Sequence, residues 1–236
     1  MTSNQLRSAV PAFHSAYLFS GRLLLASLLA LFVIPPFLEP LGGEQVAECL
    51  LFTAVMFSAL LAVSGRRVGP GGLLVLLPPI AMLWMQRLGL VAGASVLNVV
   101  YPVYLVVLVA FTVWRLLRFV LSAKEVDSEA LAAGGSIYLL IGLLWSFLYL
   151  LLGEIQAHPF HGDLSNGPGG VMSQSDAFYF SLCTLTTAGY GDITPLSHQA
   201  RIMATMESIT GVLYVGMLIA RLVSLYSQGK PAADKG

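Results

Sequence analysis

Charged side chains are scarce in this 236-residue sequence: Asp, Glu, Lys and Arg make up only 10% of it, whereas 57% is hydrophobic. A soluble domain carries about 25% charged residues. The sequence therefore cannot cover a water-facing surface, and most of it must face lipid or other protein. The formal net charge is zero and no basic patch is interleaved with aromatic residues, so we expect no nucleic-acid partner.

Cysteine is also scarce, and the common enzyme motifs are absent. Cys49 and Cys183 lie in apolar stretches without CxxC or Cys/His metal spacing, so we expect two small buried side chains and no disulfide. No Gly-x-Ser-Gly, His-Glu-x-x-His or paired membrane aspartate motif of an intramembrane hydrolase occurs. We therefore expect neither an enzyme nor an organic cofactor.

Long apolar runs, in contrast, are frequent. A bilayer core is crossed by about 20 apolar helical residues. Charged residues separate six candidate spans, at 17–35, 46–64, 72–90, 96–121, 131–152 and 200–226. Pro78-Pro79 should kink the third span. No small-x-small cleavage site follows the first run, so we expect a retained helix and not a signal peptide.

A further apolar run, 177–191, is uncharged but only 15 residues long. It is too short to cross a bilayer, so we predict a re-entrant segment, with Asp176 as a candidate N-cap of its helix. Non-helical backbone at membrane depth is tolerated only where it is buried in protein or lines a water-filled cavity. The run therefore predicts a pore or a cavity.

The distribution of basic residues predicts the orientation. If both termini are cytoplasmic, ten of the 12 Lys and Arg residues lie inside and only Arg87 and Arg201 lie outside. We therefore expect a multi-pass protein of the cell membrane with residues 153–199 on the extracellular side. The predicted division is a four-helix N-terminal unit at 1–121, a cytoplasmic linker at 122–130, a pore module at 131–226 and a short cytoplasmic tail at 227–236.

The stretch Thr184-Leu-Thr-Thr-Ala-Gly-Tyr-Gly-Asp192 resembles the selectivity filter of the potassium channel family. The family pattern Thr-Val-Gly-Tyr-Gly-Asp maps onto 187–192, with Ala188 where valine is usual, and the resemblance covers 131–226. It implies a filter formed by Thr187, Ala188, Gly189, Tyr190 and Gly191, with K+ held at the first four of these residues. It also implies supporting or outer-mouth roles for Thr184, Thr186, Asp192 and Thr194.

The residues of this stretch suit cation binding in their own right. A dehydrated cation needs several oxygens, which an extended strand supplies when its residues alternate between ordinary and left-handed conformations. Gly189 and Gly191 adopt the left-handed conformation without steric cost. The Tyr190 ring can brace the strand, and the Thr187 hydroxyl can add an oxygen. No carboxylate, which would bind the cation too tightly, occurs between the two flanking aspartates.

One strand cannot surround an ion, and rotation of identical chains is the usual way to close a ring. With the resemblance, this implies a homotetramer in which Asp192 places four carboxylates at the entrance. A pore helix would direct the negative end of its dipole toward the cavity. The expected fold is an all-α membrane protein with six transmembrane helices and a re-entrant pore helix and filter between the fifth and the sixth. We expect a passive K+ channel, with a non-selective cation channel or a cation transporter subunit as alternatives.

Several residues are candidates for gating. The resemblance assigns a bending glycine to Gly211, with Gly216 as a second candidate, and Pro195 can start the last helix. Glu207, a lone acid in that helix, could hydrogen-bond Thr184 or Thr186 behind the filter, act as a proton-sensitive gate element, or be a packing contact.

The first four helices carry no ladder of charges. Arg115 and Arg118 lie only at the inner end of the fourth span, so we interpret them as membrane anchors and expect no functional voltage sensor. In the outer loop His158, His161, Asp163 and Glu154 could bind a metal or sense protons, but solvated residues are favoured, as for His198. The expected partners are further copies of the chain, membrane lipids and an unidentified regulatory partner.

Overall fold

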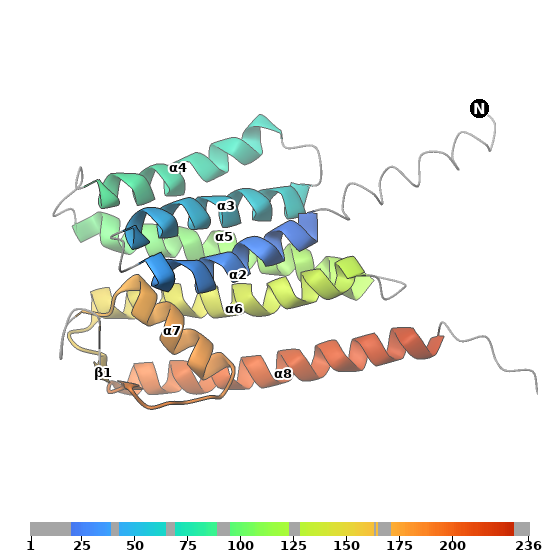
Figure 1. Ribbon diagram of the computed structural model, residues 1–236. Helices are drawn as coiled ribbons and strands as arrows, with labels where there is room; N and C mark the ends of the chain where they lie inside the picture. Colours follow the sequence, from blue (N-terminus) through green and yellow to red (C-terminus); the bar gives the residue numbers. More distant parts are fainter. Residues whose placement is uncertain are drawn as a thin grey trace, which may run out of the picture. The chain divides into compact units, whose positions relative to one another are not determined.

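The computed structural model describes residues 20–38, 43–64, 69–88, 95–122, 128–162, 164 and 171–228. Over these residues the regular structure is helical apart from two short strands, which pair with each other (Figure 1). The elements are α2 (Ser20–Leu38), α3 (Glu44–Ser64), α4 (Pro70–Arg87), α5 (Ser95–Ser122), α6 (Ser128–Ile155), β1 (Phe160–Gly162), α7 (Gln174–Leu185), β2 (Ile193–Pro195) and α8 (His198–Gln228).

Each of the six predicted spans coincides with a helix. Five helices are long and apolar enough to cross a membrane, with candidate spans at Gly21–Leu38, Val46–Ser64, Leu97–Ser122, Ser128–Ile155 and His198–Ser224. The predicted third span falls on α4, whose apolar part, Pro70–Gln86, is shorter. The crossing of the membrane by all six helices therefore stays a prediction.

The chain divides into two compact units. The first unit comprises Met1–Ala92 and Trp114–Ile137, and the second comprises Gly93–Val113 and Tyr138–Gly236. Most of the predicted linker 122–130 and of the predicted tail 227–236 lies outside the described residues, as does Asp163.

In the first unit α2 and α3 lie side by side (Figure 1). The hydroxyls of Ser27 and Ser58 lie 2.8 Å apart across this helix pair. Small hydroxyl residues let apolar helices approach closely and bond to each other where lipid offers no partner. The packing of α2 on α3 thus follows from where the serines interrupt the apolar surfaces.

In the second unit three aromatic rings pack together in the core. The rings of Tyr149, Phe160 and Phe180 meet edge to face, with centroids 5.0–5.5 Å apart. They join α6, β1 and α7, and such aromatic pairs each contribute about 0.5–1.5 kcal/mol beyond their burial. This core fixes the short helix α7 against α6.

Two helix starts differ from the sequence prediction. The N-cap of α7 is Ser173 and not Asp176; Asp176 is the third helical residue and completes a capping box by accepting the N–H of Ser173. The last helix begins at His198 and not at Pro195, because the Ser197 hydroxyl caps it by accepting the N–H of Ala200 at 3.1 Å. Ser173 and Ser197 are both ordinary N-cap residues.

Pro195 instead ends a strand that the sequence analysis missed. β1 and β2 pair antiparallel, with Gly162 opposite Ile193. Gly162 has φ of 143°, and a Cβ there would lie 1.9 Å from the carbonyl oxygen of Asp192. Only glycine fits this close approach. The β1–β2 strand pair therefore ties the segment after α6 to the residues that directly follow the predicted filter.

Candidate ion-conducting site

The candidate site is the stretch between the end of α7 and the start of β2. Its backbone has positive φ at Thr187 (58°), Gly189 (56°) and Gly191 (84°), and Ala188 and Tyr190 between them have ordinary φ. The alternation expected from the sequence is therefore present. Its non-glycine member, Thr187, was not foreseen, because threonine rarely adopts a left-handed conformation.

The carbonyl oxygens of this stretch accept no hydrogen bond from the described residues. Among the described residues, no N–H or O–H donates to the carbonyls of 187–191. Their N–H groups turn back instead: Thr187 donates to the Thr184 carbonyl at 3.0 Å and Ala188 to the Cys183 carbonyl at 2.9 Å. The stretch thus presents acceptor oxygens without competing donors.

The last carbonyls of α7 are held by the two long helices of the same unit. The Ser208 hydroxyl of α8 donates to the Thr184 carbonyl at 3.1 Å, and the Tyr138 hydroxyl of α6 donates to the Leu185 carbonyl at 3.3 Å. The Thr186 hydroxyl bonds within α7, to the Leu182 carbonyl at 2.7 Å. The backbone of Thr184 thus joins the filter segment to α8.

At the other end of the stretch, the Tyr179 hydroxyl donates to Asp192 at 2.5 Å. The carboxylate also accepts the N–H of Ile193 at 3.0 Å. The bond from Tyr179 holds the pKa of the Asp192 carboxyl below its ordinary value, and the same bond raises the pKa of Tyr179. Asp192 is therefore charged near neutral pH and is tied to the pore helix by a residue that the sequence analysis did not single out.

Glu207 is fully buried between three helices. Its carboxyl oxygens accept hydrogen bonds at 2.5 Å from Tyr149 of α6 and from Ser181 of α7. Of the alternatives given for Glu207, the hydrogen bond to Thr184 or Thr186 is not the one formed, since its partner on α7, Ser181, lies one turn earlier than Thr184. The Ser181 hydroxyl also lies 2.7 Å from the Gly142 carbonyl oxygen, so its single proton is shared between these two acceptors, and the cluster joins α6, α7 and α8.

The two glycine candidates in α8 have different surroundings. A Cβ at Gly211 would lie 2.2 Å from the Leu185 carbonyl oxygen, so Gly211 lets α8 approach the end of α7. A Cβ at Gly216 would meet nothing within 4 Å. Gly211 therefore has a packing role, and its role as a hinge stays a prediction.

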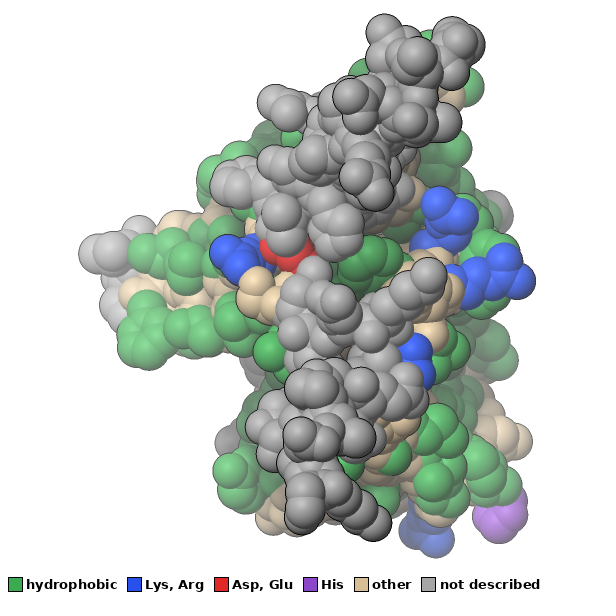
Figure 2. Space-filling model, turned by 90° about the vertical axis from the view of Figure 1, so that its right-hand side faces the viewer, with side chains coloured by type: hydrophobic (Ala, Val, Ile, Leu, Met, Phe, Trp, Pro, Cys, Tyr) green, Lys and Arg blue, Asp and Glu red, His purple; other side chains and the backbone are tan. Residues whose placement is uncertain are grey.

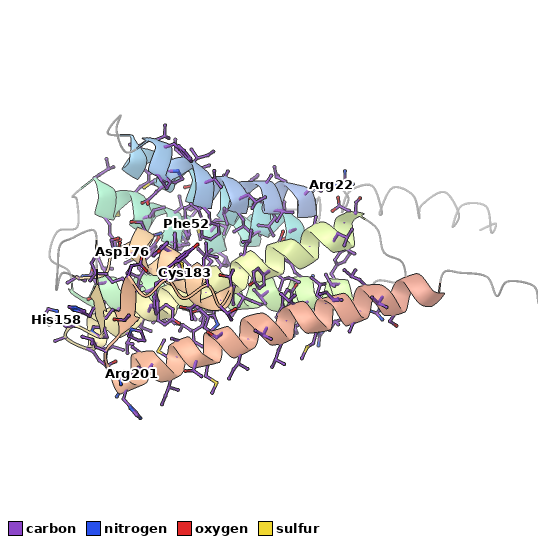
Figure 3. All side chains as sticks on the ribbon, turned by 60° about the horizontal axis from the view of Figure 1, so that its bottom comes forward. Arg22, Phe52, His158, Asp176, Cys183 and Arg201 are labelled. Carbon is purple, nitrogen blue, oxygen red and sulfur yellow. The ribbon has the colours of Figure 1, made fainter. Side chains whose placement is uncertain are left out.

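The remaining candidates lie around the β1–β2 strand pair and α7. Thr194 pairs with His161, and its hydroxyl donates to the His161 carbonyl at 3.2 Å. Figure 3 labels Asp176 and Cys183 on α7, and His158 just before β1. No three His, Cys, Asp or Glu side chains gather as a metal site in the described part of the chain.

The comparisons with known proteins agree with this geometry. Residues 137–228 match the family model described as ion channel. Two-pore potassium channel 4 of Arabidopsis thaliana is 34% identical over 103 residues, which cover 44% of this chain and 36% of that protein. Potassium voltage-gated channel subfamily A member 5 of Rattus norvegicus is 29% identical over 87 residues, which cover 37% of this chain and 14% of that protein.

The matched region is thus similar to an ion-channel domain, and the relatives that it matches are potassium channels. Together with the five apolar helices, this makes the chain a multi-pass membrane protein. The chain spans about a third or less of the length of these relatives. No solved structure matches.

Proposed function

We propose that the chain is a subunit of a potassium-selective channel, in which four copies surround one pore and K+ passes down its gradient. The observation that carries the proposal is the alternating backbone from Thr187 to Gly191, whose carbonyls accept no hydrogen bond from the described residues of the chain. In four copies each carbonyl becomes a ring of oxygens that can replace the hydration shell of an ion. Neutral carbonyls bind weakly enough for the ion to leave again.

The exposure of the filter segment in a single chain favours an assembly. Tyr190 is 75% exposed, and all residues from Thr186 to Asp192 are exposed as well. A backbone with unpaired carbonyls is tolerated at membrane depth only beside protein or water. Neighbouring copies would supply the protein on one side, and the central pore would supply the water and ions on the other.

The proposed topology has six membrane crossings, both termini in the cytoplasm and the filter opening to the outside. In this orientation the ionised Asp192 lies at the outer entrance, where four carboxylates raise the local cation concentration. The carbonyl end of α7 then faces the interior of the pore, and its dipole favours a cation there. Introduced cysteines near residues 162 and 228 should react with impermeant reagents from opposite sides.

The direct test is ion flux into liposomes that contain the purified protein. A K+ gradient should drive flux that an equal Na+ gradient does not, and Gly191→Ala should abolish flux or selectivity. The substitution has space but requires alanine at φ of 84°, so it tests the backbone conformation alone. Gly153→Ala, at a helical position of α6 where a Cβ would meet nothing within 4 Å, is the matched control.

The flux experiment also decides between the alternatives. Equal K+ and Na+ permeability would refute selectivity and direct attention to Ala188, which replaces the valine of the family pattern. Flux without unitary currents in planar bilayers would favour a transporter subunit.

A further inference from the structure

A cavity of about 290 Å³ lies within the first unit. It is formed at one end of four helices, by the first residues of α2 and α6 and by the last two turns of α3 and α5. The proposed topology places these four helix ends on the cytoplasmic side. The access of the cavity to the inner leaflet depends on that orientation but not on the filter.

Two arginines from α5 line this cavity with part of their donors uncommitted. Arg115 donates to the Val63 carbonyl at 3.2 Å, and the Arg118 guanidinium lies 4.4 Å from the ring centre of Trp114. Within the described part of the chain, neither arginine has a carboxylate within 4 Å. A guanidinium has five N–H donors, so each retains several that can bind an anion.

The acid of the cavity does not neutralise these arginines. Glu129 is only 3% exposed, and its Oε1 lies 3.2 Å from Nε of Arg22, which also donates to Ser128. Gly21 makes room for this ion pair, because a Cβ there would lie 2.9 Å from Glu129 Oε2. Glu129 is thus paired with Arg22, and among the described residues that line the cavity Arg115 and Arg118 leave an excess of positive charge.

The rest of the wall is apolar. Leu116, Phe119 and Ala133 line the cavity beside the arginines, together with the end of α3. Figure 2 shows Lys and Arg side chains among hydrophobic ones on the face that it views. An amphipathic ligand with an anionic head and an apolar tail matches this combination.

We propose that the cavity binds the headgroup of an anionic phospholipid from the inner leaflet. Arg115 and Arg118 contact the phosphate oxygens, and the apolar wall contacts the first part of the acyl chains. Basic pockets between membrane helices on the cytoplasmic side bind anionic headgroups, and guanidinium matches phosphate geometry. The volume lies at the lower limit of small-molecule sites and fits a headgroup, with the chains left in the bilayer.

The contacts of the arginines distinguish this site from simple membrane anchors. An anchoring arginine extends freely into the headgroup layer. Here Arg115 is held by a carbonyl in the last turn of α3 and Arg118 by an aromatic ring, both beside the same cavity. Side chains positioned in this way lose less conformational freedom when the phosphate binds.

The test is lipid binding to the purified full-length protein, measured by native mass spectrometry with phosphatidylglycerol and with zwitterionic phosphatidylcholine. The wild type should prefer phosphatidylglycerol. Arg115→Gln with Arg118→Gln should weaken its binding by about fivefold per arginine, equivalent to about 1 kcal/mol each. Arg201→Gln, an exposed arginine of α8 that does not line the cavity, should leave it unchanged.

A single variant and a competition with free phosphate complete the test. Arg118→Gln alone removes no hydrogen bond of the described chain and should still weaken phosphatidylglycerol binding about fivefold if the double variant fails to fold. Millimolar inorganic phosphate should not displace the lipid, whereas full displacement would assign the site to free phosphate and overturn the lipid proposal. Equal binding of both lipids to the wild type, or an unchanged preference in Arg118→Gln, would also overturn it. Neither readout depends on ion flux.

Discussion

Replacing Gly211 by alanine tests how closely α8 packs on the pore helix. The new Cβ would lie 2.2 Å from the Leu185 carbonyl oxygen and 3.0 Å from Leu185 Cδ1. Since backbone cannot yield as a side-chain end does, α8 must move away by about 1 Å to restore a van der Waals contact. Ser208 lies one turn before Gly211 on α8, and its hydroxyl donates to the Thr184 carbonyl at 3.1 Å. The movement of α8 would stretch this hydrogen bond.

The expected cost follows from these contacts. Overpacking typically costs about 1–3 kcal/mol, and a lost hydrogen bond about 0.5–1.5 kcal/mol. Replacing glycine by alanine within a helix returns about 1 kcal/mol. The net destabilisation of Gly211→Ala is therefore about 0.5–3.5 kcal/mol. Gly216→Ala has only the favourable helix term within the subunit, because nothing lies within 4 Å of its Cβ.

The assay is thermal denaturation of the purified protein, followed by the loss of its assembled peak in size-exclusion chromatography. About 1 kcal/mol shifts the midpoint by about 2–4 °C for a chain of this size. Gly211→Ala should melt below the wild type, and Gly216→Ala should not. Equal melting of the two variants would refute the close approach. Unchanged melting with altered channel opening would instead support the hinge role predicted for Gly211.

Three further predictions concern the surroundings of the filter. Glu207→Leu should destabilise the protein by about 1–3 kcal/mol in thermal denaturation, because the buried Tyr149 hydroxyl would lose its acceptor; unchanged stability would contradict the cluster. Tyr179→Phe should raise the pKa of Asp192 toward its ordinary value. The depressed pKa contributes stability that is lost as the pH falls through it, so external protons should neutralise Asp192 at a higher pH in the variant than in the wild type. The same dependence of the current on external pH in both proteins would contradict this prediction. Thr194→Tyr should strengthen external tetraethylammonium block by about 0.7–1.4 kcal/mol through a cation–π contact, and unchanged block in a conducting channel would place residue 194 away from the mouth.

The helices and the filter backbone were predictable because local constraints define them. Bilayer thickness sets the length of an apolar run, and every predicted span coincides with a helix. Glycine has a distinct conformational range, so Gly189 and Gly191 indicated the alternation that the backbone adopts. Neither inference required knowledge of which helices are neighbours.

The contacts around the filter were not predictable because they depend on tertiary position. The choice of acceptor for a donor such as Ser208 is set by the rotation of α8 about its axis, which no local pattern encodes. Glu207 shows the size of the error: its partners lie on α6 and one turn earlier on α7 than expected. The β1–β2 strand pair was missed because three-residue strands are too short for a recognisable alternation of apolar and polar residues.

The hydrogen bonds of the second unit explain how the filter carbonyls stay available. A helix ends with carbonyls that have no partner within it. At the end of α7 these carbonyls accept from Tyr138, from Ser208 and from the N–H of Thr187. The donors of the long helices bond to Thr184 and Leu185, and none of those described reaches the carbonyls of 187–191. If these residues form the proposed filter, the contacts that hold the end of α7 also leave those oxygens available to a cation.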